Sequence, residues 1–187
     1  MKRKTSREIL VDSFHELAEK KPVNQIAIRE IAGNYGYSPA TFYRQFSDKY
    51  DLMVWDYINN CIEIMDQAEE NEQNWEETVA QCCRYFYNQR QYVQNLLKNT
   101  EGQEAFFNYM TEANAKLLTK IVYENKKGPE KPGDLPLLIR TYCYGTTQAL
   151  CEWLTGRNTC TVEEMESLFV RALPEPLVPY LISNSSL

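Results

Sequence analysis

The amino-acid sequence predicts an all-α protein, in which an N-terminal three-helix unit of the helix-turn-helix type precedes a larger helical body. Three observations support this fold class. Apolar residues recur at spacings of three and four along nearly the whole chain, and no run alternates as a half-buried strand does. Capping boxes stand at Thr5–Glu8 and Thr161–Glu164, with an asparagine counterpart at Asn74–Glu77. Gly36 and Gly156 each follow a periodic segment, as a helix-ending glycine should.

The first unit is predicted to span residues 1–48, with helices at about 5–20, 27–34 and 38–46. Ser38 is a good N-cap for the third helix, and Pro39 follows at the first helical position, where its missing N–H costs nothing. The residues expected to form the core of this unit are Leu10, Phe14, Leu17, Ala18, Ile28, Ile31 and Ala32.

The body, residues 49–187, is predicted to begin with a long helix capped by Asp48. The expected helices are 49–70, 75–98, 102–126, 135–155 and 161–173. The side of the first helix that is expected to face the core carries Leu52, Trp55, Ile58 or Asn59, and Ile62. The proline-rich tail PEPLVPYLISNSSL is not expected to continue as helix.

Composition excludes several classes of protein. With 187 residues and 43% hydrophobic content the chain can bury a core, and no apolar run is long enough to cross a membrane, so a cytoplasmic protein is expected. Six cysteines show no CxxC pair and there is one histidine, His15, which favours buried reduced thiols over zinc or disulfides. No metal or cofactor is expected, and no catalytic motif supports an enzyme.

Charge is distributed unevenly along the chain. Residues 1–50 hold nine Lys and Arg against six Asp and Glu, although the whole chain carries a net charge of −6. This asymmetry indicates a short segment that approaches a polyanion, attached to an acidic body that does not.

The segment YSPATFYRQF, residues 37–46, carries the functional signal. Only Tyr35-Gly36-Tyr37 separates it from the preceding predicted helix, and such a tight glycine turn is typical of a helix-turn-helix unit. Phe42 and Phe46 are four residues apart and should point inward. Small residues near the start of the helix allow close approach to a major groove, and Tyr43, Arg44 and Gln45 are left to face it.

These residues resemble the TetR family of bacterial transcriptional regulators. The resemblance runs from about Ile9 to Leu52, and its core is AIREIAGNYGYSPATFYRQFSDKYDL. The matching positions are Ile31, Ala32, Gly36, Ser38, Thr41, Tyr43, Phe46, Lys49 and Leu52.

The resemblance implies that double-stranded DNA is the partner of the first unit. The DNA-facing positions that it implies are Ser38, Pro39, Ala40, Thr41, Tyr43, Arg44, Gln45 and Lys49. Of these, Thr41, Tyr43 and Lys49 are expected to contact phosphates. The positive charge of Arg29 on the preceding helix adds a further backbone contact. Ala27 stands where the family has a capping Thr or Ser, so that phosphate contact is missing. Tyr35 and Tyr37 flank the turn where smaller residues are usual, and either packing or DNA contact is open to them.

For the body, the resemblance implies a helical domain that pairs two subunits and often encloses a small-molecule pocket. The candidate homodimer residues are Tyr142, Gly145, Ala149 and Trp153, since small residues one turn apart permit close backbone approach; a buried intramolecular helix is the alternative. The candidate effector residues are Phe86, Arg90, Phe106, Tyr109 and Tyr142, although aromatic residues at helical spacing also serve as core. The second half, with CEWLTGRN followed by TVEEM, is similar to a subgroup that includes regulators of dihydroxyacetone kinase operons.

Together these features predict a dimeric, effector-responsive repressor that binds a palindromic operator and is nucleoid-associated when bound to DNA. The alternative is a helix-turn-helix protein whose body binds a partner protein, as a co-activator or organiser, and not a small molecule.

Overall fold

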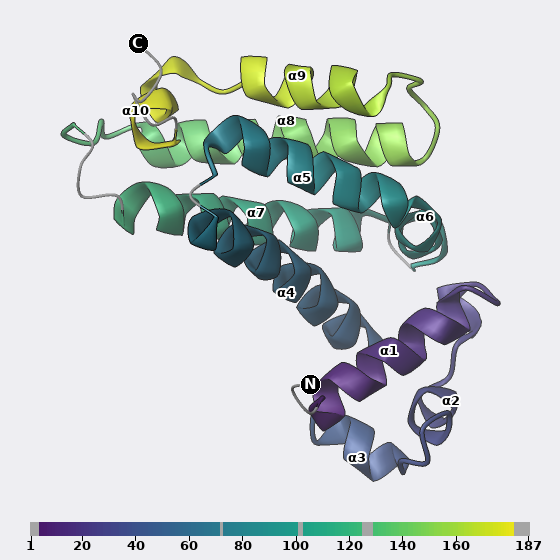
Figure 1. The fold of residues 1–187 in the computed structure, drawn as a ribbon. Coiled ribbons are helices and arrows are strands. Elements are labelled where there is room, and N and C mark those ends of the chain that lie inside the picture. Colours follow the sequence, from purple (N-terminus) through teal and green to yellow (C-terminus); the bar gives the residue numbers. More distant parts are fainter. Residues whose placement is uncertain (1–3, 72, 101–102, 125–128, 182–187) are drawn as a thin grey trace.

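The computed structural model describes residues 4–71, 73–100, 103–124 and 129–181, and all regular structure in these ranges is helical. The all-α prediction is confirmed. The molecule has two parts: a small N-terminal unit and a body of stacked long helices, joined by one diagonal helix (Figure 1).

The N-terminal unit consists of α1 (Ser6–Ala18), the 3₁₀ helix η1 (Val23–Gln25), α2 (Ile28–Gly33) and α3 (Pro39–Tyr43). The third helix ends earlier than predicted, at Tyr43 in place of Phe46. The core is made by fully buried apolar side chains from all three α-helices and the following turn, namely Leu10, Phe14, Ile31, Phe42 and Phe46. Burial of both phenylalanines confirms that they point inward.

Helix α4 (Lys49–Glu70) connects the two parts and has the predicted bounds. The Asp48 side chain caps it by accepting hydrogen bonds from the N–H groups of Tyr50 and Asp51. The predicted buried side is wrong beyond Leu52, because Ile58 and Ile62 are exposed. Its buried residues are Leu52, Met53, Asp56, Tyr57, Cys61, Ile64 and Ala68.

The body contains α5 (Trp75–Asn88), α6 (Arg90–Asn99), α7 (Gln103–Glu124), α8 (Leu135–Leu154) and α9 (Val162–Arg171). Helix α8 packs on α7, and α9 packs on α5. The single helix predicted at 75–98 is wrong, because the chain turns at Gln89: Figure 1 shows α5 lengthwise and α6 end-on. The predicted ends of α7 at 102 and 125–126 lie outside the described residues.

The tail also differs from the prediction. It forms the 3₁₀ helix η2 (Glu175–Leu177) and the short helix α10 (Val178–Leu181), which packs on α7. Pro176 and Pro179 stand within the first turn of each, where a missing N–H breaks no helical hydrogen bond. The prolines therefore end α9 but allow new helical turns after it.

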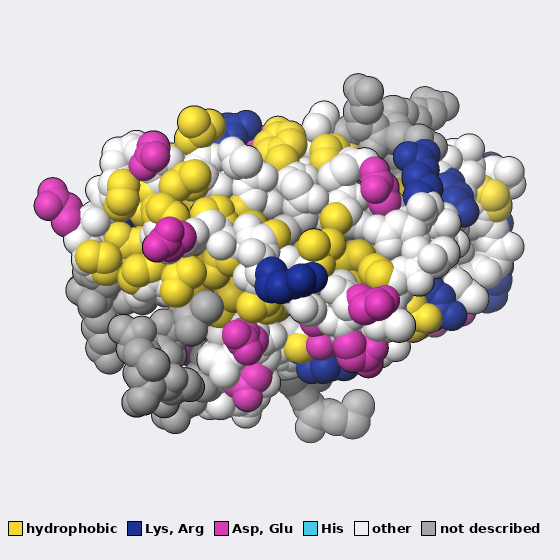
Figure 2. Space-filling model, turned by 90° about the horizontal axis from the view of Figure 1, so that it is seen from above, with side chains coloured by type: hydrophobic (Ala, Val, Ile, Leu, Met, Phe, Trp, Pro, Cys, Tyr) yellow, Lys and Arg dark blue, Asp and Glu magenta, His cyan; other side chains and the backbone are white. Residues whose placement is uncertain are grey.

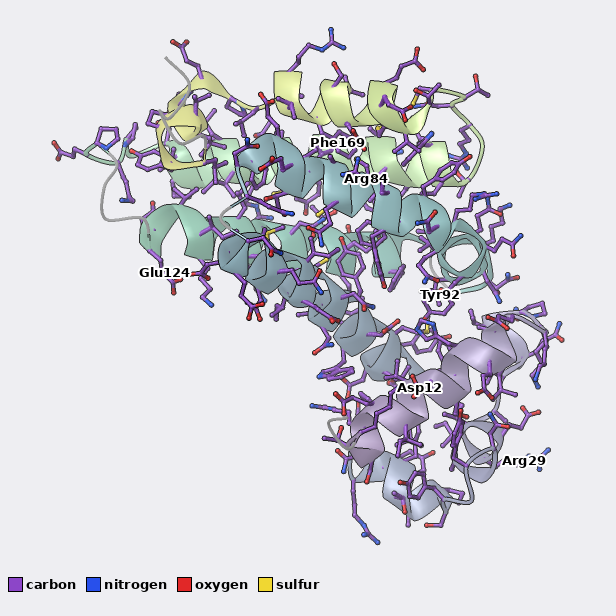
Figure 3. The ribbon with its side chains drawn as sticks, viewed as in Figure 1. Asp12, Arg29, Arg84, Tyr92, Glu124 and Phe169 are labelled. Atoms are coloured by element: carbon purple, nitrogen blue, oxygen red, sulfur yellow. The ribbon has the colours of Figure 1, made fainter. Side chains whose placement is uncertain are left out.

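Helix α6 fastens the body to the N-terminal unit. The Asn95 amide donates to the carbonyl oxygens of Ala18 (2.7 Å) and Lys21 (2.9 Å) and accepts from the N–H of Val23 (3.0 Å). Figure 3 shows Tyr92, also on α6, pointing toward α1. These contacts explain the turn at Gln89, because a continuous straight helix would carry this segment away from α1.

A buried carboxylate completes the junction between the two parts. Asp56 on α4 meets the His15 ring nitrogen at 2.8 Å and accepts from the Tyr92 hydroxyl at 2.9 Å, and Asn60 donates to its other oxygen at 2.9 Å. The His15 and Tyr92 rings stack with centroids 4.0 Å apart. Side chains from α1, α4 and α6 thus converge on one carboxylate.

No helix of the described residues is both long and apolar enough to cross a membrane.

Candidate nucleic-acid interface and internal cavity

The candidate interface lies at the outer end of the N-terminal unit, where α3 packs on α2 along one side and turns its other side outward (Figure 1). Ser38, Pro39, Ala40, Tyr43 and Arg44 are exposed, and Thr41 and Gln45 are partly buried. The side chain of Tyr43 is among the most exposed large ones, at 58%. The structure therefore brings seven of the predicted contact residues together on one surface.

Hydrogen bonds at both ends fix the orientation of α3. At its start the Ser38 hydroxyl accepts from the N–H of Thr41 at 3.3 Å. At its end the Arg7 guanidinium donates to the Gln45 carbonyl at 2.7 Å and lies over the ring of Phe46, 4.8 Å from its centroid. A short helix has little stability of its own, so these tertiary contacts hold the surface in shape.

The turn before α3 requires a glycine. Gly36 has φ of 74°, a conformation that costs other residues free energy, and the N–H of Tyr37 donates back to the Ala32 carbonyl at 2.9 Å. This arrangement ends α2 and starts α3 within a few residues, as the spacing predicts.

The two tyrosines beside this turn are placed differently: Tyr35 is exposed at 46%, and Tyr37 is partly buried. Tyr37 is partly buried against the core cluster. The Tyr35 hydroxyl donates to Glu16 on α1 at 2.5 Å, and this bond raises the pKa of Tyr35 and lowers the pKa of Glu16. Of the two roles left open by the sequence, packing fits Tyr37, while Tyr35 is held against α1 by its hydrogen bond to Glu16.

Lys49 is placed differently from the other predicted contacts. Its ammonium group donates to the carbonyl oxygens of Val23 (2.9 Å), Asn24 (3.1 Å) and Ile26 (3.2 Å). An ammonium group has three protons, and these three acceptors match that number. Lys49 therefore holds the η1 segment to the start of α4.

Arg29 and Arg44 supply exposed positive charge to the unit. Figure 3 shows Arg29 projecting outward from α2. Lys4, by contrast, pairs with Asp12 at 2.6 Å. Ala27 has no side chain that could cap α2, and Glu30 instead accepts from the Ala27 N–H at 2.8 Å. The missing capping hydroxyl is as the sequence indicates.

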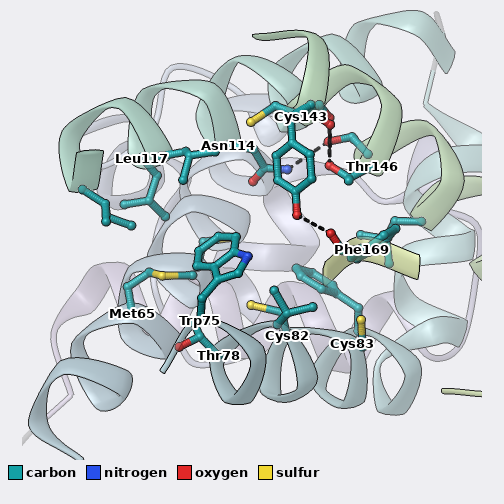
Figure 4. A pocket seen from close by; sticks show the side chains of 18 of the residues that line it. Met65, Trp75, Thr78, Cys82, Cys83, Asn114, Leu117, Cys143, Thr146 and Phe169 are labelled. Atoms are coloured by element: carbon teal, nitrogen blue, oxygen red, sulfur yellow. Dashed lines mark hydrogen bonds between the residues drawn. The ribbon is translucent and has the colours of Figure 1, made fainter. Parts of the chain in front are cut away.

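The body contains an apolar cavity of about 120 Å³ lined mainly by α4, α5, α7 and α8 (Figure 4). Four of its wall residues are cysteines, Cys61, Cys82, Cys83 and Cys143, and burial raises the pKa of Cys61, Cys83 and Cys143 to about 12. Burial also raises the pKa of Cys82, so none of these thiols is a ready nucleophile at neutral pH.

The other wall residues are mostly apolar or aromatic. They are Tyr57, Met65, Trp75, Thr78, Val79, Phe86, Asn114, Leu117, Leu118, Ile121, Tyr142, Thr146, Thr147, Leu150 and Phe169.

Most polar groups of this wall bond to one another. The Tyr57 hydroxyl donates to the Asn114 side-chain oxygen at 2.9 Å, and the Tyr142 hydroxyl donates to the Phe169 carbonyl at 2.8 Å. The indole N–H of Trp75 is buried and makes no hydrogen bond of normal geometry. Burial raises the pKa of the Tyr142 hydroxyl, and the nearby indole N–H of Trp75 acts in the opposite direction. The cavity thus presents one unsatisfied donor and no charged group.

Only part of the predicted effector set lines this cavity. Phe86 and Tyr142 do. Arg90 is exposed and lies over the Tyr87 ring, Tyr109 is 52% exposed, and Phe106 packs in the core beside Tyr57. The sequence did not predict that the cysteines and Trp75 line this cavity, because their helical spacing identifies them only as core residues. Spacing within one helix does not reveal which four helices surround a common space.

The predicted dimer residues divide in the same way. Tyr142 and Trp153 are buried inside the subunit, where the Trp153 indole donates to the Cys160 carbonyl at 2.8 Å. Gly145 is exposed and Ala149 is partly buried. The exposed stripe of α8 consists of Pro136, Leu137, Arg140, Thr141, Tyr144, Gly145 and Gln148, and Leu168 of α9 is exposed as well. Figure 2, which looks down on this side of the body, shows hydrophobic side chains gathered toward the α10 end.

Among the described residues, no group of three or more His, Cys, Asp or Glu side chains could hold a metal ion.

Comparison with known proteins identifies the family. The family model TetR_C_8, described as a transcriptional regulator C-terminal region, matches residues 73–174. The HTH-type dhaKLM operon transcriptional activator DhaS of Lactococcus lactis is 21% identical over 122 residues, which cover 65% of this chain and 63% of the relative. An uncharacterized HTH-type transcriptional regulator of Haemophilus influenzae is 37% identical over 51 residues, 27% of this chain and 25% of the relative. The chain thus matches less than two thirds of the length of either relative.

A solved structure, that of the dihydroxyacetone kinase operon activator DhaS, has the same fold. Its TM-score is 0.67 at 18% sequence identity, and the alignment covers 94% of this chain and 97% of that chain. Because the family model matches more than half of the chain, and its members are regulators and not enzymes, this chain belongs to the TetR family of DNA-binding transcriptional regulators.

Proposed function

We propose that the protein acts in the bacterial cytoplasm as a homodimer that binds a palindromic operator through α3 of each subunit. The observation that carries the proposal is the uncovered α3 surface, in which an exposed arginine and tyrosine stand beside small residues that permit close approach to bases. Two-fold symmetry then sets the two half-sites about one helical turn apart, roughly 34–36 Å, or a multiple of it.

In this proposal the contacts have different tasks. Arg44 and Gln45 face base edges, while Ser38, Thr41 and Tyr43 bond to phosphates and fix the register of α3 in the groove. Arg29 adds a phosphate contact from α2. We reassign Lys49 to positioning, because its ammonium group already donates to three backbone carbonyls. The DNA-binding part keeps the limits 1–48 and the body the limits 49–187.

The exposed α8 stripe supports dimerisation. This exposed side carries Leu137 at 66% exposure and Tyr144, and the one charge between them, that of Arg140, is paired with Glu112 at 3.0 Å. Exposed apolar groups of this kind are typical of a protein–protein interface. In a two-fold dimer the same stripe of both subunits meets itself. We therefore propose α8, with Leu168 of α9, as the dimer face, in place of the pair Tyr142 and Trp153.

The internal cavity supports response to a small molecule. Tyr57 and Cys61, on its wall, belong to the same helix as Asp56, which bonds to His15 of the N-terminal unit. A ligand that fits only one position of α4 would favour one orientation of the DNA-binding unit and change operator affinity. An apolar space of this kind between four helices favours a small molecule over the alternative, a partner protein that binds the body.

Selection of bound sequences from random DNA duplexes tests the proposal. The wild-type protein should yield a palindrome, and Arg44→Ala should relax preference at particular bases, with a loss of roughly 1–3 kcal/mol of binding free energy. Arg157→Ala removes an exposed arginine of the body and serves as the matched control. An identical consensus with and without Arg44 would remove that residue from the reading surface.

A reporter gene placed behind the selected operator reveals the direction of regulation. The sequence predicts a repressor, so disruption of this gene should raise reporter expression. The relative from Lactococcus lactis is named as an activator. If this chain acts in that way, disruption lowers expression instead.

A further inference from the structure

A second pocket adjoins the internal cavity. It has a volume of about 450 Å³ and lies between α4 and α7, beside α10. Five residues line both spaces: Met65, Trp75, Thr78, Leu117 and Ile121. In Figure 4 the labelled Met65, Trp75 and Leu117 lie together at one end of the cavity. The two spaces are therefore adjacent at this end, which we take as their junction, and we call the second pocket the mouth.

The mouth and the cavity differ sharply in charge. The mouth is lined by three carboxylates, those of Asp66 and Glu69 on α4 and Glu124 on α7, against one ammonium group, that of Lys120. None of these four groups forms an ion pair with another described residue, and among the described lining residues carboxylates outnumber ammonium groups by three to one. The Lys131 ammonium lies outside this lining, over the ring of Tyr180. Figure 3 shows Glu124 at the outer end of α7.

The cavity itself favours one neutral ring. Cavities of about 150 Å³ lined by apolar side chains bind benzene, and the present volume of about 120 Å³ is close to that size. Its walls are rich in sulfur and aromatic groups, which contact aromatic rings favourably. A charged group would lose its hydration there without gaining an ion partner.

The junction suits a positive charge. Trp75 borders both spaces, and an indole ring attracts an ammonium group placed over its face. A cation at this point would lie between that ring and the carboxylates of the mouth, whereas an anion would meet those carboxylates and be repelled.

From this arrangement we infer that the effector is an aryl-alkyl amine with a single ring. The ring occupies the cavity, and the ammonium group lies at the junction beside Trp75 and faces Asp66, Glu69 and Glu124. The inference rests on the proposed effector response of the body, and it adds the chemical class of the effector.

Four probes test the class: 2-phenylethylamine, 2-phenylethanol, which has the same number of non-hydrogen atoms, 3-phenylpropionate and the ringless butylamine. Their binding to the full-length protein without DNA is measured by isothermal titration calorimetry at neutral pH, where both amines are protonated. We expect 2-phenylethylamine to bind at least about fivefold more tightly than the alcohol, from the weak attraction of exposed charges and the ring of Trp75. The carboxylate and the ringless amine should bind more weakly than either.

Two sets of variants separate the head from the ring. Neutralising the mouth with Asp66→Asn, Glu69→Gln and Glu124→Gln should remove the preference for the amine over the alcohol and leave alcohol binding unchanged. Glu63→Gln, on the exposed side of the same helix, is the matched control. Leu117→Trp should narrow the junction and weaken both ligands, and circular dichroism checks that the helices are retained.

Specific outcomes would overturn the inference. Equal binding of amine and alcohol would reject the cationic head, and equal binding of butylamine and 2-phenylethylamine would reject the ring. Operator binding is measured separately by fluorescence anisotropy. If operator binding is intact and no probe binds, the ligand class is wrong while the regulator remains; if the amine binds as expected and no operator is found, the proposed function fails instead.

Discussion

At the scale of single residues, the direction in which a side chain points decides its role. The sequence predicts this direction only where a regular helical spacing applies. Phe42 and Phe46 were predicted to point inward because they are one helical turn apart, and both are buried. Tyr35 and Tyr37 flank a turn, where no period applies, and their roles depend on Glu16 and on the core of the folded unit. Lys49 likewise matches a family position, but only the fold brings three carbonyl oxygens around its ammonium group.

Replacement of Lys49 by methionine tests its positioning role. The variant leaves three carbonyl oxygens without their donor, so the free energy of unfolding should fall by about 1–3 kcal/mol. DNA affinity should decrease while its dependence on salt concentration keeps the wild-type slope. Lys20→Met, which removes an exposed charge from the same unit, is the control. A slope reduced by about one unit with unaltered stability would return Lys49 to the phosphate contacts.

The buried thiols predict a loss of stability at high pH. The pKa of Cys143 is raised by burial to about 12, above that of a thiol in the unfolded chain, so the unfolded state loses its proton first. Stability from this group is fully present below the unfolded pKa of about 8.5 and is lost as pH rises toward 12, by up to about 1.4 kcal/mol per pH unit. Urea unfolding between about pH 8 and 11 should therefore show a shallower decline for Cys143→Ala than for wild type. Cys160→Ala, at a partly exposed position where burial raises the thiol pKa less, should stay closer to the wild-type slope.

At the scale of elements, capping residues and the spacing of apolar residues predicted nearly every helix. The differences between predicted and observed helices arise from tertiary contacts. The bounds of α4 follow from Asp48 and those of α9 from the capping box at Thr161. Nothing in Asn88-Gln89 forbids a helix, and the chain turns there because Asn95 and Tyr92 bond to α1 and α4. The buried side of α4 was misjudged because its isoleucines lie on both sides, while Asp56 is buried by its partners.

Loss of the Asn95 side chain should loosen the N-terminal unit while the body stays folded. Asn95→Ala removes three hydrogen bonds, each worth about 1 kcal/mol, between α6 and the segment that follows α1. Amide hydrogen exchange should become faster at residues 18–25 and remain slow in α8, and operator affinity should fall about tenfold. Gln91→Ala, at an exposed position of α6, should change neither. Uniformly faster exchange would show instead that α6 stabilises the whole chain.

At the scale of the whole molecule, the division into a basic reading unit and an acidic body was visible in sequence, while the surfaces of the body were not. Large aromatic residues such as Tyr142 and Trp153 fit an interface by composition, yet both complete the core of one subunit. The outward stripe of α8 is made of less conspicuous residues, and only the packing of α8 on α7 shows which side remains uncovered.

Charge on that stripe should separate the subunits. Leu137→Glu combined with Tyr144→Glu places like charges opposite each other in a two-fold dimer, so sedimentation velocity should show a monomer. Operator affinity should fall strongly, because one α3 reaches only one half-site. Tyr109→Glu changes a comparably exposed tyrosine of α7 and should remain dimeric. A dimer in both variants would place the interface elsewhere.

Asp56 and Tyr57 are neighbours on α4, and they face different partners: the carboxylate meets His15 and Tyr92, and the phenol ring lines the cavity. Because both side chains are fixed to one helical turn, α4 cannot rotate under one without moving the other. This pairing constrains how the protein can evolve. Other wall residues are free to change and adapt the cavity to a new ligand while operator reading is retained. A substitution at either of these two positions alters ligand fit and DNA-binding geometry together. Ligand specificity can therefore diverge among descendants of this chain faster than the coupling through α4 that links ligand binding to the DNA-binding unit.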